Sequence, residues 1–547
     1  RQSAACVLVR PHHPLARALA PGPVPKASVL ENSPKLSQRE TGWLLLSVLI
    51  VALCGIAYEL IIAAVSSYLL GNSIAQFSIT IGLFMFAMGI GSYLTKFMKD
   101  NLVERFIQIE IAVALIGGLS AAILFVVFPF YALYKPTMYG LILIIGTLVG
   151  LEIPLLTRII SRSNSFSDSL AHVLSLDYIG ALIGSVSFPL LLLPHLGLFR
   201  SSFAIGLLNI SVAIIALVLL GKSHPKVRWA WFPALAVIAL LFFGLLASSW
   251  ITKYAEGQLF ANEIIYAEQT PYQRIVLTSH PRNGEVRLYL DGHLQFAAAD
   301  EHRYHESLVH PIMSYGRPPK SILVLGGGDG LAVREILKFP SVESIEVVDI
   351  DPKMTDISQT LGPIRRMNED SLQDPRVRLI HVDAFNFVQE AYQARLKSGN
   401  WYDRILIDLP DPHSEALNKL YSKEFYGLIH RILDQDGVLV TQSGSPLITR
   451  EAFWCVAETL RAASFSTLSY RTHLNSFGEW GFHLAVKDSN PLDLKGLQLA
   501  DVKRRFLTDE VFVASQVFSL DTAPVPSPVN SIFEPKLYLL YEAGLQR

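Results

Sequence analysis

The chain has 547 residues, and at about 150 residues per domain this length is enough for three or four domains. Hydrophobic residues make up 51% of it and charged residues only 17%, against about 25% in ordinary soluble proteins. A formal net charge of −1 does not provide the basic surface of a nucleic-acid-binding protein, so we expect no nucleic-acid partner. The cysteines Cys6, Cys54 and Cys455 lie too far apart for a disulfide framework or a zinc motif, so we expect no metal site.

The first part of the chain divides into a tail and a membrane domain. Residues 1–41 are rich in proline and lack apolar periodicity, which predicts a disordered tail. Only roughly 8% of residues 41–250 are charged, and seven apolar stretches there are each long enough to cross a hydrocarbon core of about 30 Å. These stretches cover residues 43–70, 74–95, 106–128, 137–157, 170–193, 200–221 and 229–251. We therefore expect a multi-pass α-helical membrane domain of about seven helices over residues 42–252, in contact with a lipid bilayer.

The basic residues predict how these helices are oriented. Eleven Lys and Arg residues flank the side that carries the amino terminus, and three flank the other side. The bias towards cytoplasmic Lys and Arg then places the amino terminus inside. Seven crossings would place everything beyond residue 251 outside the cytoplasm.

Four acids lie within or at the ends of the apolar stretches: Glu59, Glu110, Glu152 and Asp177. Ionisable groups at membrane depth cost several kcal/mol unless they are paired or hydrated, so each is a candidate for an ion path or a path for a cationic substrate. The alternative that we favour is a structural role in helix association, with Arg158 as the helix-end partner of Glu152.

Beyond residue 256 short apolar runs alternate with turn residues. Residues 272–279 and 285–296 alternate as strands around Arg282-Asn283-Gly284, which predicts a small antiparallel sheet within residues 253–315. From Ser321 the strand-like runs SILVLG, SIEVVDI, RVRLIHV, DRILIDL and GVLVTQ alternate with helical segments. This rhythm predicts a doubly wound parallel sheet, an α/β Rossmann-like domain over residues 316–495, followed by a C-terminal extension over residues 496–547.

The turn after the first of these strands is suited to a nucleoside. Gly326 and Gly328 let a ligand approach the backbone there, but Leu331 stands where a dinucleotide fingerprint has its third glycine. Asp349 ends the next strand, where a carboxylate can accept both ribose hydroxyls. Asp383 ends the third strand, where it can meet an adenine amino group. The pattern therefore favours an adenosyl ligand without a pyrophosphate.

Further acids gather at the same edge of the predicted sheet. Asp329 lies in the glycine turn, and Asp408 and Asp411 follow the fourth strand in IDLPDP. The carboxyl ends of parallel strands meet at one crevice, so we expect these carboxylates to face a common, cationic ligand. The other interpretation is that they cap helices or form turns.

Several motifs follow one another along the chain: YQRIVLT, LYLDGHLQFAAADEHRYHESLVHP, ILVLGGGDG, VVDID and DLPDP followed by LYSKEFY. In this order they resemble the spermidine synthase (aminopropyltransferase) family and, with the preceding helices, its membrane-bound bacterial branch. The resemblance implies a methyltransferase-like fold. It also implies that decarboxylated S-adenosylmethionine donates an aminopropyl group to putrescine, which gives spermidine and methylthioadenosine. The donor is a co-substrate, so no cofactor is expected, and the family implies a homodimer or homotetramer.

The same resemblance assigns roles to individual residues. It implies nucleoside contacts from Gln273, Asp349, Asp383 and Ala384, beside the turn of Gly326 and Gly328. It implies amine contacts from His305, Asp329, Asp411 and Tyr304. Asp408 matches the proton acceptor. The chain departs from the family in DPHSEALNKL, which lacks a glycine and a proline that soluble relatives carry, and in LNSFGEWGF, where relatives have a tyrosine before PSG.

Two other functions fit parts of the sequence. One is a membrane transporter or sensor with a non-catalytic domain that binds polyamine or an adenosyl ligand, and the other is a small-molecule methyltransferase. The carboxylate of an ordinary methyl donor would be repelled by Asp329, and Asp408 has no use in a module that only binds. We expect a protein of the cell (inner) membrane whose catalytic half faces the cytoplasm, where the donor is made. This orientation requires that a stretch such as the one with Glu152 or Asp177 be re-entrant, or that the charge rule fail.

Overall fold

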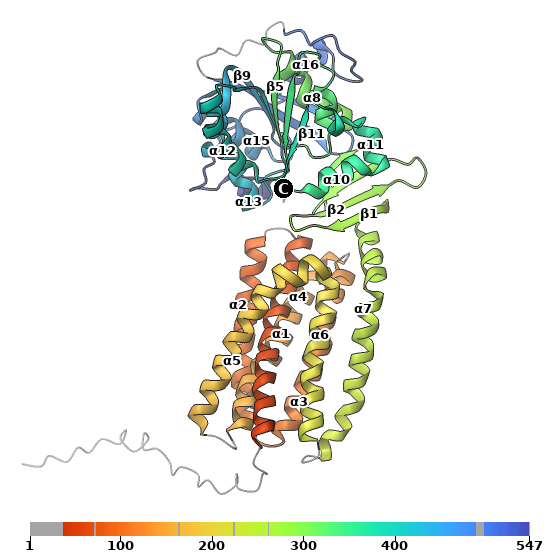
Figure 1. The fold of residues 1–547 in the computed structure, drawn as a ribbon, viewed down its shortest axis with the longest axis vertical. Helices are drawn as coiled ribbons and strands as arrows, with labels where there is room; N and C mark the ends of the chain where they lie inside the picture. Colours follow the sequence, from red (N-terminus) through yellow and green to blue (C-terminus); the bar gives the residue numbers. More distant parts are fainter. Residues whose placement is uncertain are drawn as a thin grey trace, which may run out of the picture.

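In the computed structural model of the chain, the described residues are 37–70, 73–128, 130–161, 165–221, 225–260, 262–487 and 497–545. Most of the predicted tail, residues 1–36, lies outside them. Figure 1 shows a helical bundle and, beyond one end of it, an α/β part.

The bundle is built from seven long helices. They are α1 (Gln38–Leu70), α2 (Ser73–Leu94), α3 (Leu102–Val127), α4 (Tyr131–Ile160), α5 (Phe166–Ser187), α6 (Leu193–Leu220) and α7 (Trp231–Leu259). A π-helical turn, Phe188–Leu192, joins α5 to α6 without a gap. Among the described residues, six helical stretches are long and apolar enough to cross a membrane, and the longest of them is Phe166–Leu220.

The stretch Phe166–Leu220 passes along the bundle twice. Its 55 residues would extend about 80 Å as one straight helix, far more than a hydrocarbon core of about 30 Å. Gly197 has a φ of 70° and a ψ of −179°, which no right-handed helix contains, and the chain turns back there (Figure 1). α4 and α5, which contain Glu152 and Asp177, are continuous helices of 30 and 22 residues, so the re-entrant alternative gains no support from a break in either helix.

The two faces of the bundle helices differ in what they contact. Inward side chains such as Phe106, Ile142 and Phe203 form one apolar core that all seven helices share. Outward side chains are equally apolar but exposed, for example Phe86 and Phe243 at 62% and 69%. An apolar surface of this extent is typical of a protein that contacts lipid.

A small antiparallel sheet follows α7 directly. Its strands, in the order of the sheet, are β1 (Glu263–Gln269), β2 (Arg274–Ser279), β3 (Val286–Leu290) and β4 (His293–Ala297). The single strand expected over 285–296 is divided, because Asp291 and Gly292 have φ values of 49° and 83° and form a tight turn. β1 was not predicted.

The main sheet has seven strands in the order β10-β11-β9-β8-β5-β6-β7. They are β5 (Ser321–Gly326), β6 (Ser344–Val348), β7 (Val377–Ile380), β8 (Tyr402–Asp408), β9 (Leu433–Gln442), β10 (Phe465–Leu474) and β11 (Gly478–Lys487). The five predicted runs, β5 to β9, are parallel. The sheet as a whole is mixed and not all-parallel, because β10 and β11 form an antiparallel hairpin that pairs with β9.

Helices cover both faces of the main sheet. One face carries α8 (Glu301–Ser314), α9 (Leu331–Ile336) and α16 (Asp509–Ser515). The other face carries α12 (Ala384–Ser398), α14 (Lys423–Ile432), α15 (Arg450–Ala462) and α17 (Leu537–Leu545). The C-terminal extension thus contributes a helix to each face.

The edge of the sheet where the parallel strands end faces the bundle. α10 (Pro352–Thr360), with α11 (Gly362–Asn368) after it, follows β6, and the short α13 (Glu415–Asn418) follows β8. In Figure 1 both α10 and α13 lie at the end of the α/β part that is nearest to the helical bundle. A ligand at the carboxyl ends of the strands is therefore bound on the side that faces the bundle.

Candidate active site

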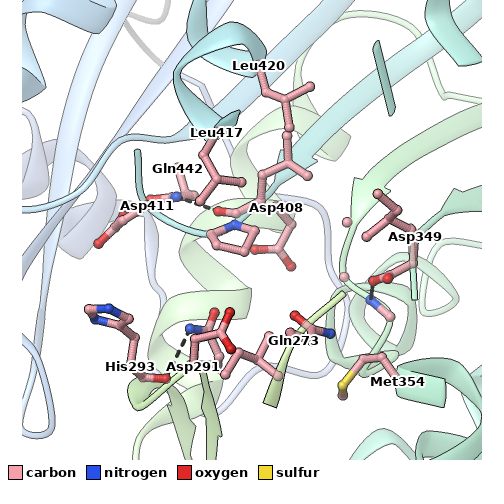
Figure 2. Close-up of a pocket in the computed structure, with 18 of the residues that line it drawn as sticks. Gln273, Asp291, His293, Asp349, Met354, Asp408, Asp411, Leu417, Leu420 and Gln442 are labelled. Carbon is pink, nitrogen blue, oxygen red and sulfur yellow. Dashed lines mark hydrogen bonds between the residues drawn. The ribbon is translucent and has the colours of Figure 1, made fainter. Parts of the chain in front are cut away.

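A cavity of about 590 Å³ lies at this edge of the sheet. It is lined by the β2–β4 sheet and α8, by the carboxyl ends of β5, β6, β8 and β9, by the start of α12 and the segment around α13, and by the β10–β11 hairpin and α17. Every residue predicted for the site, namely Gln273, Tyr304, His305, Gly326, Gly328, Asp329, Asp349, Asp383, Ala384, Asp408 and Asp411, lines this one cavity. Figure 2 shows Asp408 between Asp349 on one side and Asp411 on the other.

The glycine turn brings the backbone close to the acids. Gly326 has a φ of 84°, and a Cβ atom on it would lie 2.1 Å from the carbonyl oxygen of Asp408. A Cβ atom on Gly328 would lie 2.4 Å from Oδ2 of Asp349. With no side chain there, the Gly328 amide donates to Asp349 Oδ2 at 3.1 Å. Both positions therefore require glycine.

Asp349 follows β6 and lines the side of the cavity where the sequence predicts a nucleoside. Its Oδ1 accepts a hydrogen bond from the Asp351 amide at 2.9 Å, which fixes the carboxyl plane together with the bond from Gly328. Burial raises the pKa of Asp349 to about 6. Gln273 lies beside it, but its Nε2 donates to Asp351 Oδ2 at 3.0 Å, so its amide oxygen is the atom left for a ligand.

Asp383 and Ala384 begin α12 at the same side. Oδ1 of Asp383 caps this helix by accepting from the Asn386 amide at 3.1 Å, and Oδ2 pairs with Lys419 Nζ at 2.8 Å. Burial raises the pKa of Asp383, but the hydrogen bond and charge of Lys419 and the backbone hydrogen bonds at the start of α12 together outweigh burial, so the net pKa is lowered. Asp383 is thus ionised and already paired. Lys419 was not predicted, because a lone lysine in a helical segment carries no signal.

Asp408 ends β8 at the centre of the cavity. The hydroxyl of Tyr304, from α8, donates to its Oδ1 at 2.7 Å. Burial raises the pKa of Asp408, while the charge of His305 and the bond from Tyr304 act in the opposite direction. A buried carboxylate with a raised pKa is a suitable proton acceptor.

His305 carries a positive charge beside two of these acids. Its Nδ1 lies 2.9 Å from Oε2 of Glu301, one helical turn away on α8. Burial alone would lower the pKa of His305, but the hydrogen bond and charge of Glu301 raise it to about 9. Asp329 lies close to this charge, yet burial still raises its pKa to about 6. The carboxylates at the centre are therefore partly neutralised by the protein itself.

Asp411 has a partner that the sequence did not suggest. Tyr541, on α17 of the C-terminal extension, donates its hydroxyl hydrogen to Asp411 Oδ2 at 2.6 Å. Oδ1 of Asp411 is buried and has no hydrogen-bond partner in the described part of the chain, so it can accept from a ligand. Burial raises the pKa of Asp411 to about 6, and the bond from Tyr541 opposes this rise.

Two groups of aromatic side chains also line the cavity, and none of these residues was predicted for the site. His293 at the start of β4 and His413 after β8 stack with ring centroids 4.5 Å apart. Burial lowers the pKa of His413 to about 4, so the stack is neutral at physiological pH. Phe477 and Trp480, from the β10–β11 hairpin, line the same cavity. His413 lies in the segment DPHSEALNKL and Trp480 in LNSFGEWGF, the two segments that depart from the resemblance.

Fold and site together define an α/β enzyme for a nucleoside and a cationic partner. Among the described residues, no group of three or more His, Cys, Asp and Glu could hold a metal ion. Residues 301–495 match the Spermine/spermidine synthase domain.

Curated relatives match almost the whole chain. A polyamine aminopropyltransferase of Leptospira interrogans is 41% identical over 504 residues, which are 92% of this chain and 99% of the relative. Polyamine aminopropyltransferase 1 of Ralstonia nicotianae is 43% identical over 85% of this chain and 88% of its own length. A solved structure of spermidine synthase in complex with the transition-state analogue AdoDATO is 26% identical, with a TM-score of 0.41, over 47% of this chain and 85% of its own. The chain belongs to the polyamine aminopropyltransferase (spermine/spermidine synthase) family and is a transferase.

Proposed function

We propose that this transferase moves the aminopropyl group of decarboxylated S-adenosylmethionine to putrescine. The products are spermidine and methylthioadenosine. The observation that carries the proposal is the order of the acids in one cavity, with Asp408 between Asp349 and Asp411 (Figure 2).

The donor nucleoside is assigned to the side of Asp349. The carboxylate of Asp349 accepts the ribose hydroxyls, and the backbone of Gly326 and Gly328 leaves room for the donor next to it. Gln273, Asp383 and Ala384 surround the adenosyl group. Because the charge of Asp383 is already paired with Lys419, Asp383 does not neutralise the charge of the donor. Its role is to cap α12 and to contact the edge of the adenine ring.

The amine is assigned to the side of Asp411. Putrescine is dicationic at neutral pH, so one ammonium group must be held and the other must lose a proton. Oδ1 of Asp411 is free to accept from the distal ammonium group, and Asp329 adds negative charge near the reacting end. Tyr304 positions the attacking nitrogen through its contact with Asp408. His305 carries a positive charge and affects the amine indirectly, because it offsets part of the negative charge of Asp329 and Asp408.

The chemical step needs a base and alignment. Asp408 accepts a proton from the nearer ammonium group, and the freed nitrogen attacks the carbon next to the sulfonium. The C–N bond forms as the C–S bond breaks, and the sulfur leaves with the electron pair as neutral methylthioadenosine. The reaction consumes no oxidant or reductant.

We further propose that the protein is a multi-pass protein of the cell membrane with its catalytic half in the cytoplasm, where the donor is made. The apolar outer face of the bundle supports a lipid environment. Because seven helical passes separate the two ends, this orientation requires an amino terminus outside the cytoplasm, which the distribution of Lys and Arg disfavours. Reporter fusions after Lys253 and after residue 547 test it. Phosphatase activity with a dark fluorescent-protein fusion at both positions would refute it.

The central experiment uses detergent-solubilised full-length protein with the decarboxylated donor and putrescine. We expect methylthioadenosine and spermidine in equal amounts, and no methylated amine when S-adenosylmethionine replaces the donor. Binding of the donor without product would favour a non-catalytic module and overturn the proposal. Analytical ultracentrifugation of the same preparation tests the homodimer or homotetramer that the family resemblance implies.

A further inference from the structure

Two carboxyl groups lie fully buried inside the helical bundle. Glu110 of α3 and Glu152 of α4 are each 0% exposed. Each lies eight residues from the end of its helix on the side away from the catalytic half, which is about 12 Å along the axis. Both are therefore at a depth where an unpaired charge costs several kcal/mol.

No basic side chain compensates them. Arg158, the partner that the sequence offers to Glu152, instead donates to the carbonyl oxygens of Thr95 and Met98, at 3.1 and 2.7 Å. The structure places no Lys, Arg or His in an ion pair with Glu110 or Glu152 within the described residues. The carboxyl groups of Glu110 and Glu152 lie within side-chain hydrogen-bond reach of each other and form a pair. The other titratable groups that interact with the pair are Cys54 and Tyr58 of α1 and Asp177 of α5, and none of these can supply a positive charge.

A third helix adds a polar side chain that is also incompletely satisfied. Asn209 of α6, 1% exposed, donates from Nδ2 to Oε2 of Glu110 at 3.0 Å and to the Glu110 carbonyl oxygen at 3.2 Å. These bonds hold its amide against the carboxyl pair. Its Oδ1 nevertheless has no partner in the described part of the chain, and neither has the hydroxyl of Tyr58, which is 0% exposed.

Apart from the Tyr58 hydroxyl, which can also donate, the unsatisfied atoms around the pair are all acceptors. Oε1 of Glu110, both carboxyl oxygens of Glu152 and Oδ1 of Asn209 are buried acceptors without a donor. A buried acceptor without a partner costs about 1–3 kcal/mol, and a charged one more. The site therefore has four unsatisfied acceptors, while the Tyr58 hydroxyl can offer one hydrogen and none of the described groups around the pair offers a positive charge. A proton on the carboxyl pair supplies both a further donor and a positive charge.

We infer that Glu110 and Glu152, with Asn209, form a proton-binding site in the membrane half. One proton is shared by the two carboxyl groups at neutral pH, so that the pair carries at most one negative charge. A buried acidic pair of this kind is the element by which a helical bundle binds a proton at membrane depth. The site is separate from the transferase cavity, and its residues have no part in that reaction.

Infrared spectroscopy of the full-length protein in detergent at pH 7.5 tests this inference. The difference spectrum between the parent and a Glu110→Gln/Glu152→Gln variant should contain the C=O band of one protonated carboxylic acid. Glutamine keeps the size of each side chain, and unchanged transferase activity would show that the variant is folded. Asp168→Asn, which removes an exposed acid in the first turn of α5, is the matched control and should leave the band intact.

The outcome distinguishes a proton from a metal cation. The band should have the same intensity in sodium chloride and in choline chloride of equal ionic strength. Absence of the band from the difference spectrum at pH 7.5 would overturn the inference. Loss of the band on addition of sodium would also overturn it, because the site would then bind Na⁺ in place of a proton.

Discussion

Replacing Tyr541 by phenylalanine should weaken amine binding in a pH-dependent way. The change removes one hydroxyl group, which donates to Asp411 at 2.6 Å from a helix outside the matched family domain. A hydrogen bond to a charged group contributes about 1.5 to 3 kcal/mol, and one pKa unit corresponds to about 1.36 kcal/mol. The pKa of Asp411, raised by burial to about 6, should therefore rise by a further 1 to 2 units, roughly.

This shift sets the size of the effect. At pH 7 the ionised fraction of Asp411 should fall from about 90% to between about 10% and 50%. The KM for putrescine should then increase by about 2- to 10-fold at pH 7, and by less than about 2-fold at pH 9, where Asp411 is ionised in both proteins. The value of kcat at saturating amine and the affinity for methylthioadenosine should not change, since neither depends on the distal ammonium group.

Steady-state rates of methylthioadenosine release, measured against putrescine at pH 6, 7, 8 and 9, give both constants. The matched control is Tyr538→Phe, which alters a tyrosine on the same helix that does not line the cavity. A KM that rises equally at every pH would mean that α17 has only been displaced. An unchanged KM at pH 7 would show that Asp411 does not hold the amine.

Four further substitutions and one control substitution test the remaining assignments. Asp408→Asn removes the proton acceptor and keeps the side-chain volume nearly constant, so kcat should fall by about 10²-fold or more. Calorimetry should show the parental affinity for methylthioadenosine. A turnover near that of the parent would exclude Asp408 as the base. Asp349→Ala should weaken the binding of methylthioadenosine by roughly 1.5 to 3 kcal/mol, whereas Asp329→Ala should chiefly raise the KM for putrescine. The reverse result would mean that the nucleoside and the amine bind on the opposite sides of the cavity from those proposed. Gly328→Ala places a methyl group 2.4 Å from Oδ2 of Asp349 and should abolish nucleoside binding. The control Gly427→Ala, whose methyl group meets nothing within 4 Å, should leave nucleoside binding unchanged and leave the stability of the protein unchanged or increased. Equal behaviour of the two variants would contradict the close approach of the Gly328 backbone to Asp349.

The acids of the site could be predicted because they follow regular strands. Asp349 and Asp408 come directly after apolar runs whose alternation with helices identifies a parallel sheet, and the ends of such strands meet by geometry. His305 was assigned to the amine from its motif alone. Its contact with Glu301, and hence its charge, depends on which side of α8 faces the sheet.

The partners that come from distant parts of the chain could not be predicted. Tyr541 lies 130 residues after Asp411 and reaches it only because α17 packs on the same face of the sheet as α15. The stack of His293 on His413 depends on the tight turn that separates β3 from β4, and that turn was hidden in a run read as one strand. In the helical bundle, hydropathy identified the helices. It could not show that Arg158 contacts the backbone just beyond the end of α2 and does not pair with Glu152, because that depends on how the helices pack.

The positive charge of His305 inside an acidic cavity affects the end of the catalytic cycle. The donor and putrescine bring two charges each, but methylthioadenosine leaves neutral, so spermidine retains three charges and Asp408 holds the fourth as a proton. A cavity lined only with carboxylates, with no positive charge of its own, would bind this trication more tightly than either substrate. Because Glu301 keeps His305 charged, with its pKa raised to about 9, the resting site already contains a cation that competes with the product for the same carboxylates. We therefore expect His305 to lower substrate affinity somewhat and to speed product release, which would raise turnover when release limits the rate.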